Sequence, residues 1–170
     1  MARRVGRRGG VGSDLIKGAI AGAVATFVMG KVTNYMYDRE DPEAREVEDA
    51  ARGGRSSYET AAEKAADAAG RSLDRTEREQ AGNAIHWALG IGAGAAYALF
   101  RRQVQGFGAT AGTAFGTAFW AFIDEGLVPA LGLTPGPTAF PWQTHARGLV
   151  GHLTFGTVTD GTLRLLDRVA

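Results

Sequence analysis

Residues 80–100, QAGNAIHWALGIGAGAAYALF, contain no Asp, Glu, Lys or Arg. A second uncharged stretch, residues 103–123, follows after only two arginines. At a rise of about 1.5 Å per residue, a helix of this length crosses the ~30 Å hydrocarbon core of a bilayer. The two stretches therefore predict consecutive membrane-spanning helices.

Residues 15–37, LIKGAIAGAVATFVMGKVTNYMY, predict a further span, although this stretch contains Lys17 and Lys31. Lys17 lies near one end, where its head group can reach the interface. Lys31 must reach the far interface or face other helices, and Asp160 either pairs with it or lies near the cytoplasmic surface. A cleaved signal peptide is the rival interpretation, but no small-x-small cleavage site followed by a soluble domain is evident.

The predicted fold is all-α: a polytopic four-helix transmembrane bundle with a polar helical insert between the first and second helices. Local signals place two helix starts and one end. Ser13-Asp14 is a plausible N-cap, Thr76 and Glu79 have capping-box spacing, and Pro129 limits the third helix. We expect a basic N-terminal tail at 1–13 and one membrane domain at 14–170, with helices at about 14–37, 77–100, 106–127 and 145–166 and the insert at 38–76.

The insert explains why the average hydropathy is slightly negative, because charge is concentrated there. Thirteen acidic and eight basic residues lie between Asp38 and Glu79. Asp41-Pro42-Glu43 opens a short helix that Gly53-Gly54 closes, and Ser56 with Glu59 opens a second. We expect solvated helices over the membrane surface; an amphipathic interfacial anchor is the alternative, although an alanine face buries weakly.

Basic residues predict the orientation of the spans, since cytoplasmic loops carry an excess of Lys and Arg. The first eight residues contain four arginines, and Arg101-Arg102, Arg164 and Arg168 follow the second and fourth spans. Four crossings place all of these on one side. We therefore expect a multi-pass protein of the bacterial inner, or cytoplasmic, membrane with both termini cytoplasmic.

Composition excludes several classes of function. The balance of 19 basic and 18 acidic residues leaves no field that would attract nucleic acid. There is no cysteine, which removes disulfides, thiolate metal ligands and cysteine nucleophiles. No phosphate loop, nucleophile elbow or catalytic triad pattern is present. We therefore expect no catalytic residues, no cofactor and no nucleic-acid partner.

Glycine is frequent, at 25 residues, and several glycines are spaced so that two share one helix face. In a bilayer such small-xxx-small faces let helix backbones approach closely. We expect these faces to pack the bundle, and they could equally serve a homodimer or a partner subunit. The glycines concerned are Gly18 with Gly22, Gly90 with Gly94, Gly108 with Gly112, and Gly112 with Gly116.

Polar residues of the second, third and fourth spans are expected in one membrane leaflet. His86 follows one span start, Asp124 and Glu125 precede one span end, and His145 and His152 lie seven residues apart on one face. Imidazole and carboxylate groups that converge can bind a divalent metal or pass protons. In the structural alternative, the carboxylates meet interfacial water, His145 caps the preceding loop, and His86 and His152 hydrogen-bond to neighbouring helices.

The loop at residues 131–142, LGLTPGPTAFPW, contains three prolines and two glycines, and it belongs to an ordered set of short motifs. The set comprises Gly132-Leu133-Thr134-Pro135, Phe140-Pro141-Trp142, Gly151-His152 and an upstream His86-Trp87 span that ends near Tyr97. Over roughly residues 80–160 the chain thereby resembles the YagU-like family of bacterial inner-membrane proteins. That resemblance implies location and helix architecture, and it implies no catalytic residues.

Three functions follow in order of preference. The first is a non-enzymatic integral membrane protein, a structural or accessory subunit whose partners are the lipid bilayer and either other copies of itself or other membrane subunits. The second is a proton, ion or metal transport or sensing element that uses the five His and carboxylate residues. The third is a membrane enzyme, which would require a substrate cavity lined by the same groups.

Overall fold

The computed structural model describes residues 10–103 and 110–169. Every regular element in these two ranges is helical. The elements are α1 (Val11–Tyr37), α2 (Pro42–Arg52), α3 (Ser57–Ala68), α4 (Arg75–Gln103), α5 (Ala111–Phe122), the π-helix η2 (Ile123–Leu127), α6 (Val128–Ala130), the 3₁₀-helix η3 (Pro137–Ala139) and α7 (Trp142–Val169).

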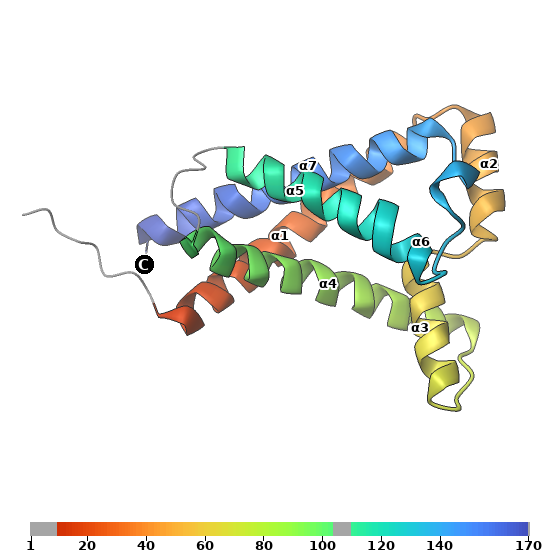
Figure 1. Ribbon diagram of the computed structural model, residues 1–170, viewed down its shortest axis with the longest axis horizontal. Coiled ribbons are helices and arrows are strands. Elements are labelled where there is room, and N and C mark those ends of the chain that lie inside the picture. The colour runs from red at the N-terminus through yellow and green to blue at the C-terminus, as the bar shows by residue number, and fades with distance from the viewer. Residues whose placement is uncertain (1–9, 104–109, 170) are drawn as a thin grey trace, which may run out of the picture.

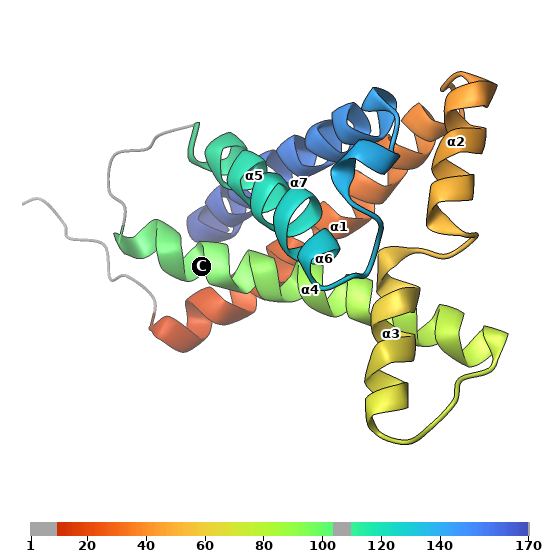
Figure 2. The same ribbon diagram turned by 45° about the vertical axis from the view of Figure 1, so that its right-hand side comes forward.

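Four long helical stretches run side by side: α1, α4, the continuous α5–η2–α6 stretch, and α7 (Figure 1). Helix α1 packs against both α4 and α7, and α5 packs against α7. The start of α1 and the end of α7 lie at one end of the molecule, whereas α2, α3 and α6 lie at the other. Figure 2 shows α3 crossing over the start of α4, with which it is packed.

The helix positions agree with the sequence prediction, but several ends differ. Helix α1 begins at Val11 after an N-cap at Gly10, so Ser13-Asp14 is not its cap. The cap of α4 is Asp74, whose carboxylate accepts from the Glu77 backbone while Glu77 accepts from the Asp74 backbone. The prediction that Thr76 and Glu79 form the capping box was therefore wrong, because Asp74 and Glu77 form it.

The insert contains the two helices expected of it, with the expected caps. Asp41 accepts a hydrogen bond from the Glu43 backbone, Pro42 occupies the first turn, and Gly53 ends α2 in the left-handed conformation at φ 59°. Ser56 and Glu59 form a capping box at the start of α3. These local signals act within a few residues, which is why the sequence alone predicts them.

The third stretch continues three residues past its expected end, through Pro129 to Ala130. A proline inside a helix has no N–H to donate and crowds the carbonyl four residues earlier, here that of Glu125. The helix widens to π geometry at Ile123–Leu127, directly before the proline. This widening relieves the crowding and lets α6 follow without a break.

Helices α1 and α4 meet through glycines. A Cβ built on Gly94 would lie 2.5 Å from the Gly22 Cα and would also overlap the Gly18 carbonyl oxygen. A Cβ on Gly90 would overlap the Thr26 hydroxyl, which is hydrogen-bonded to the Gly22 carbonyl at 2.8 Å. Only glycine allows these two backbones to lie this close.

Helices α5 and α7 use the same device. A Cβ on Gly112 would lie 2.5 Å from the Gly156 carbonyl oxygen, and one on Gly116 would overlap the His152 carbonyl. The buried core beside these contacts includes Tyr97, Phe155 and Leu163, which are at most 2% exposed. Gly108, the remaining glycine of the predicted packing set, lies outside the described residues.

One described helix, α1, is long and apolar enough to cross a membrane by length and composition. The core helix of a soluble protein and a signal sequence pass the same test, and a core helix is mostly buried. Only 28% of the most apolar 18-residue window of α1 is buried. No other helix in the described ranges passes this test.

Candidate functional site

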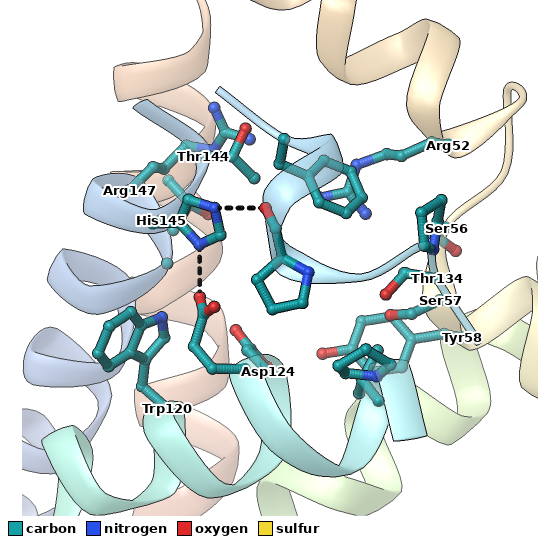
Figure 3. Close-up of a pocket in the computed structure, with 18 of the residues that line it drawn as sticks. Arg52, Ser56, Ser57, Tyr58, Trp120, Asp124, Thr134, Thr144, His145 and Arg147 are labelled. Carbon is teal, nitrogen blue, oxygen red and sulfur yellow. Dashed lines mark hydrogen bonds and ion pairs between the residues drawn. The ribbon is translucent and has the colours of Figure 1, made fainter. Parts of the chain in front are cut away.

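The polar residues of interest gather at the end of the molecule that carries α2, α3 and α6. Asp124 and Glu125 lie on η2, directly after α5, and His145 lies in the first turn of α7. All three side chains line one cavity, and Figure 3 shows Asp124 and His145 at its edge, beside the loop before α7. The π-helical turn sets the direction of both carboxylates, since it adds a residue to the turn that carries them.

His145 and Glu125 form a close pair, with the imidazole Nδ1 2.7 Å from the Glu125 Oε1. The other ring nitrogen, Nε2, lies 3.0 Å from the Pro137 carbonyl oxygen. The Pro137 carbonyl can only accept, so Nε2 donates to it, while Nδ1 shares a hydrogen with the Glu125 carboxyl group. The two contacts tie the loop before α7 to η2.

His152 lies about two turns further along α7 than His145 and is 4% exposed. Its Nδ1 is 3.0 Å from the Gly148 carbonyl oxygen and 3.6 Å from the Asp124 Oδ2. The ring also packs edge-on against Phe119, with centroids 5.3 Å apart. The backbone carbonyl is the closer partner, and Nδ1–H donates to it.

His86 lies apart from these two pairs. Its ring packs against Tyr58, with centroids 4.8 Å apart, and against Trp87. It lines a separate, open hollow together with Glu59 and Asn83. The predicted five-residue cluster therefore divides into two His–carboxylate pairs and one separate histidine. In the described ranges no three His, Asp or Glu side chains are arranged to hold a metal ion.

Sequence reasoning missed a buried ion-pair network beside the cavity. Arg147 donates to both carboxylate oxygens of Glu48, at 2.6 and 2.5 Å, and also to Glu40. Arg52 donates to Glu48 at 2.8 Å, and the Thr144 hydroxyl donates at 2.7 Å. The network links α7 to the insert and to the end of α1.

A signal for this network was present in the sequence. Arg147 lies in the predicted fourth span, and it is the only Asp, Glu, Lys or Arg between Trp142 and Thr159. A lone charge in such a span requires a partner, because an unpaired buried charge is very unfavourable. The partner could not be named, since the insert at 38–76 offers eleven acidic residues and spacing does not single out Glu48.

The network determines the ionisation of Glu48, which is 3% exposed. Burial alone would raise the pKa of Glu48, but the hydrogen bonds from Arg147 and Thr144 and the nearby positive charges hold that pKa below its usual value. Glu48 is thus a buried carboxylate that stays ionised. Its role is to fasten the insert to α7.

The cavity itself has a volume of about 210 Å³. Its walls come from the insert, η2, the loop before α7 and the first turns of α7, as Figure 3 shows. The lining combines aromatic, hydroxyl, carboxylate, guanidinium and imidazole groups. They include the side chains of Arg52, Tyr58, Trp120, Asp124, Phe140 and His145.

A second polar network lies at the opposite end of the molecule, around Asp160. This carboxylate accepts from the Tyr97 hydroxyl at 3.0 Å and from Arg164 at 2.6 Å, and Arg101 lies 3.6 Å away. Lys31 does not pair with it, because the Lys31 ammonium lies over the Phe27 ring, 5.4 Å from its centroid. The pairing of Asp160 with Lys31, one of the two alternatives expected from the sequence, was therefore wrong.

Comparison with known proteins identifies a family. Residues 63–161 match the family model described as a protein of unknown function, DUF1440. No curated protein and no solved structure matches the chain. The matched segment runs from α3 to the second half of α7, so it includes both His–carboxylate pairs and Arg147. Because the match covers more than half of the 170 residues, the chain belongs to the DUF1440 family.

Proposed function

We propose that this chain is a multi-pass integral membrane protein whose four long helical stretches cross the bilayer. The observation that carries the proposal is the distribution of side-chain size on α1. The buried residues of this helix are small: Gly18, Ala21, Gly22, Ala25 and Thr26. Its large apolar residues are exposed, among them Leu15, Ile16, Ile20, Val24 and Phe27.

This distribution is the reverse of what a water-soluble core requires. In water, large apolar side chains are buried because their transfer from solvent stabilises the fold. In lipid that driving force between helices is absent, and small residues lie at helix contacts because they permit close packing. An outward row of Ile, Val and Phe on α1 is therefore suited to hydrocarbon.

The other three stretches support the same proposal. Helix α4 has 29 residues, about 43 Å at the helical rise, and residues 80–100 carry no charge. Large apolar residues are exposed on each stretch, including Ile91 on α4, Phe122 on α5 and Val150 on α7. Both helical ends nearest the chain termini lie at one end of the molecule, as an even number of crossings requires (Figure 1).

The location follows from charge and resemblance. Arg101, Arg164 and the arginines of the first eight residues would share one side, which the positive-inside tendency makes the cytoplasm. The similarity to the YagU-like family supports a bacterial inner membrane. The insert and the loop before α7 would then face the opposite side.

Within that membrane we propose a structural or accessory role, as a subunit of a homo-oligomer or of a larger assembly. Several charged side chains of the long helices are paired, with Asp160 held by Tyr97 and Arg164 and with His145 held by Glu125. Such pairing stabilises a scaffold. The exposed apolar face of α1 would contact lipid or partner helices.

Membrane extraction tests the proposal. Full-length protein expressed in a bacterial host is expected in the membrane fraction, resistant to alkaline carbonate and released by mild detergent. Native gel electrophoresis of the extract is then expected to give a species larger than one chain with its bound detergent. Recovery as a folded monomer in the detergent-free soluble fraction would refute the membrane proposal, and a strictly monomeric detergent extract would refute the subunit role.

A proton-transport or proton-sensing element is the second candidate, favoured by the two His–carboxylate pairs. Imidazole and carboxylate groups can exchange protons at physiological pH. Purified protein in sealed liposomes is expected to carry a proton flux under an imposed pH gradient, and Asp124→Asn with His152→Ala should abolish it. A flux no larger than that of empty liposomes would eliminate this candidate.

A further inference from the structure

Several polar groups that line the cavity have no hydrogen-bond partner among the described residues, among them the Asp124 carboxylate, the Tyr58 hydroxyl and the Trp120 Nε1. The Asp124 carboxylate has only His152 near it, at the ion-pair distance of 3.6 Å, and makes no closer polar contact. The Tyr58 side chain is largely withdrawn from solvent, and burial, with the nearby Asp124 charge, raises the pKa of Tyr58 to about 12. Figure 3 shows the Tyr58 hydroxyl pointing across the cavity toward Asp124.

The other ionisable groups around the cavity already contact partners. Arg147 and Arg52 contact Glu48 and Glu40, and His145 contacts Glu125. The nearest charged partner of Asp124 is His152, at 3.6 Å, and the Asp124 carboxylate accepts no hydrogen bond from the described residues. An occupant that brings N–H donors and a positive charge would supply the hydrogen bonds that the Asp124 carboxylate and the Tyr58 hydroxyl lack, because polar groups inside a cavity are normally satisfied.

We infer that this cavity binds a small primary-amine cation, held between the Asp124 carboxylate and the Tyr58 hydroxyl oxygen. An ammonium group has three N–H donors and can use both oxygens. Its alkyl part would contact the Trp120 and Phe140 rings, which line the same cavity. The faces of these rings also attract the positive charge of the ammonium group.

Other classes of ligand fit less well. An anion would need free guanidinium groups, and those of Arg52 and Arg147 are engaged by Glu48 and Glu40. A divalent metal would need three ligating side chains, and no such group occurs among the residues that the structure describes. The cavity of about 210 Å³ exceeds the ~30 Å³ share of one water molecule several-fold, which leaves room for a short alkyl chain.

The inference does not depend on the membrane proposal, because binding is measured in detergent whatever the location of the chain. Isothermal titration calorimetry of the full-length protein with propylammonium chloride at neutral pH is expected to show saturable binding at one site. Potassium and tetramethylammonium chloride are titrated in parallel, since neither can donate a hydrogen bond. Both are expected to bind at least about tenfold more weakly, the loss of one charged hydrogen bond.

Variants locate the binding at the cavity. Asp124→Asn is expected to abolish the heat of binding, and Tyr58→Phe, which removes only one oxygen, is expected to weaken binding about tenfold. Glu46→Gln on the exposed face of α2 is the matched control and should bind as the unaltered protein does. Circular dichroism and thermal unfolding of each variant establish that it is folded.

Three results would overturn the inference. The first is the absence of saturable propylammonium binding to the unaltered protein. The second is unchanged binding by a folded Tyr58→Phe or Asp124→Asn variant. The third is potassium binding as tight as that of propylammonium, which would point to a simple cation site in which N–H donors play no part.

Discussion

Side-chain size at single positions determines how closely the long helices approach. On α4, Gly94 faces the α1 backbone, whereas Gly92, two residues away on the same helix, has no neighbour within 4 Å of a Cβ built on it. The contact between α1 and α4 therefore requires glycine at position 94. It does not require glycine at position 92.

Alanine substitutions separate these two cases. Gly94→Ala is expected to destabilise the protein by about 1–3 kcal/mol, because the new methyl group meets the Gly18 and Gly22 backbones, which cannot move aside without separating the helices. Gly92→Ala is the matched control and should be neutral or slightly stabilising, since alanine favours helix. Unfolding in detergent micelles, followed by circular dichroism, measures the difference; equal stabilities of the two variants would contradict the observed α1–α4 contact.

The buried carboxylate of Glu48 predicts a dependence of stability on pH. Its pKa in the folded protein lies below the unfolded value, so ionised Glu48 contributes stability that is fully present above the unfolded pKa and is lost as pH falls through the folded pKa. The midpoint of thermal unfolding is therefore expected to fall as the pH drops below about 4.5, the ordinary value for Glu. Glu48→Gln should flatten this dependence.

The exposed neighbour Glu46 provides the control for that experiment. Glu46→Gln retains the contacts of Glu48 with Arg147 and Thr144, so its profile should follow that of the unaltered protein. A Glu48→Gln profile as steep as the control would show that another group is responsible for the acid sensitivity.

At the scale of the element, local chemistry accounts for most helix ends. Three helices begin with a side-chain cap: Asp41, Ser56 and Asp74. The first two were predicted from sequence because each stands at an isolated signal. The third was misplaced, because Asp74, Thr76, Glu77 and Glu79 offer two overlapping capping boxes, and only the backbone path decides between them.

The start of α4 can be tested by substituting both candidates. Asp74→Ala is expected to cost about 0.5–2 kcal/mol, since it leaves the Glu77 backbone N–H without its acceptor. Thr76→Ala should have little effect, because the structure places Thr76 inside the helix. Denaturant unfolding of both variants measures this, and a larger loss for Thr76→Ala would place the cap where the sequence alone suggested it.

The loop between α6 and α7 is held by long-range contacts that no local pattern reveals. His145 contacts the Pro137 carbonyl at 3.0 Å, and Lys64 donates to the Leu131 carbonyl at 3.0 Å. His145→Ala is expected to speed amide hydrogen exchange in residues 133–140 about tenfold, through loss of its hydrogen bond to the Pro137 carbonyl. His86→Ala is the control, because His86 lies outside this loop; equal exchange in both variants would show that His145 does not hold it.

The π-helix lies beyond sequence prediction for a related reason. Pro129 signalled the end of the third helix correctly to within a few residues, yet a proline can either stop a helix or distort it. Packing of α5 on α7 through Gly112 and Gly116 keeps the backbone helical, and the distortion moves to Ile123–Leu127. The directions of Asp124 and Glu125 depend on that outcome.

For the whole molecule, the sequence predicts helix content and order well and the site only in part. Apolar runs, two of them without any charge, are properties of single segments, and they predicted the four long helical stretches. The site depends on which segments meet. His145 and Glu125 are in contact. His86 lies apart from them, on the part of α4 that α3 covers, and its ring packs against Tyr58 of α3. The Arg147–Glu48 pair required knowledge of how the insert folds back on α7.

The membrane proposal rests on two observations. Large apolar side chains are exposed on all four long helical stretches, and the buried residues of α1 are small. In the proposed arrangement the insert and the end of α7 lie on opposite sides of the bilayer. The chain contains no cysteine, so a single introduced cysteine provides a unique label at any position. Asp67→Cys on α3 and Arg168→Cys at the end of α7 are suitable substitutions, as both positions are exposed.

Labelling of these two variants with a membrane-impermeant maleimide in intact cells tests the central claim most directly. The Asp67→Cys variant is expected to react in intact cells, and the Arg168→Cys variant is expected to react only after the membrane is opened. Reaction of both variants in intact cells, or protection of both until the membrane is opened, would contradict an arrangement in which four helices cross the bilayer.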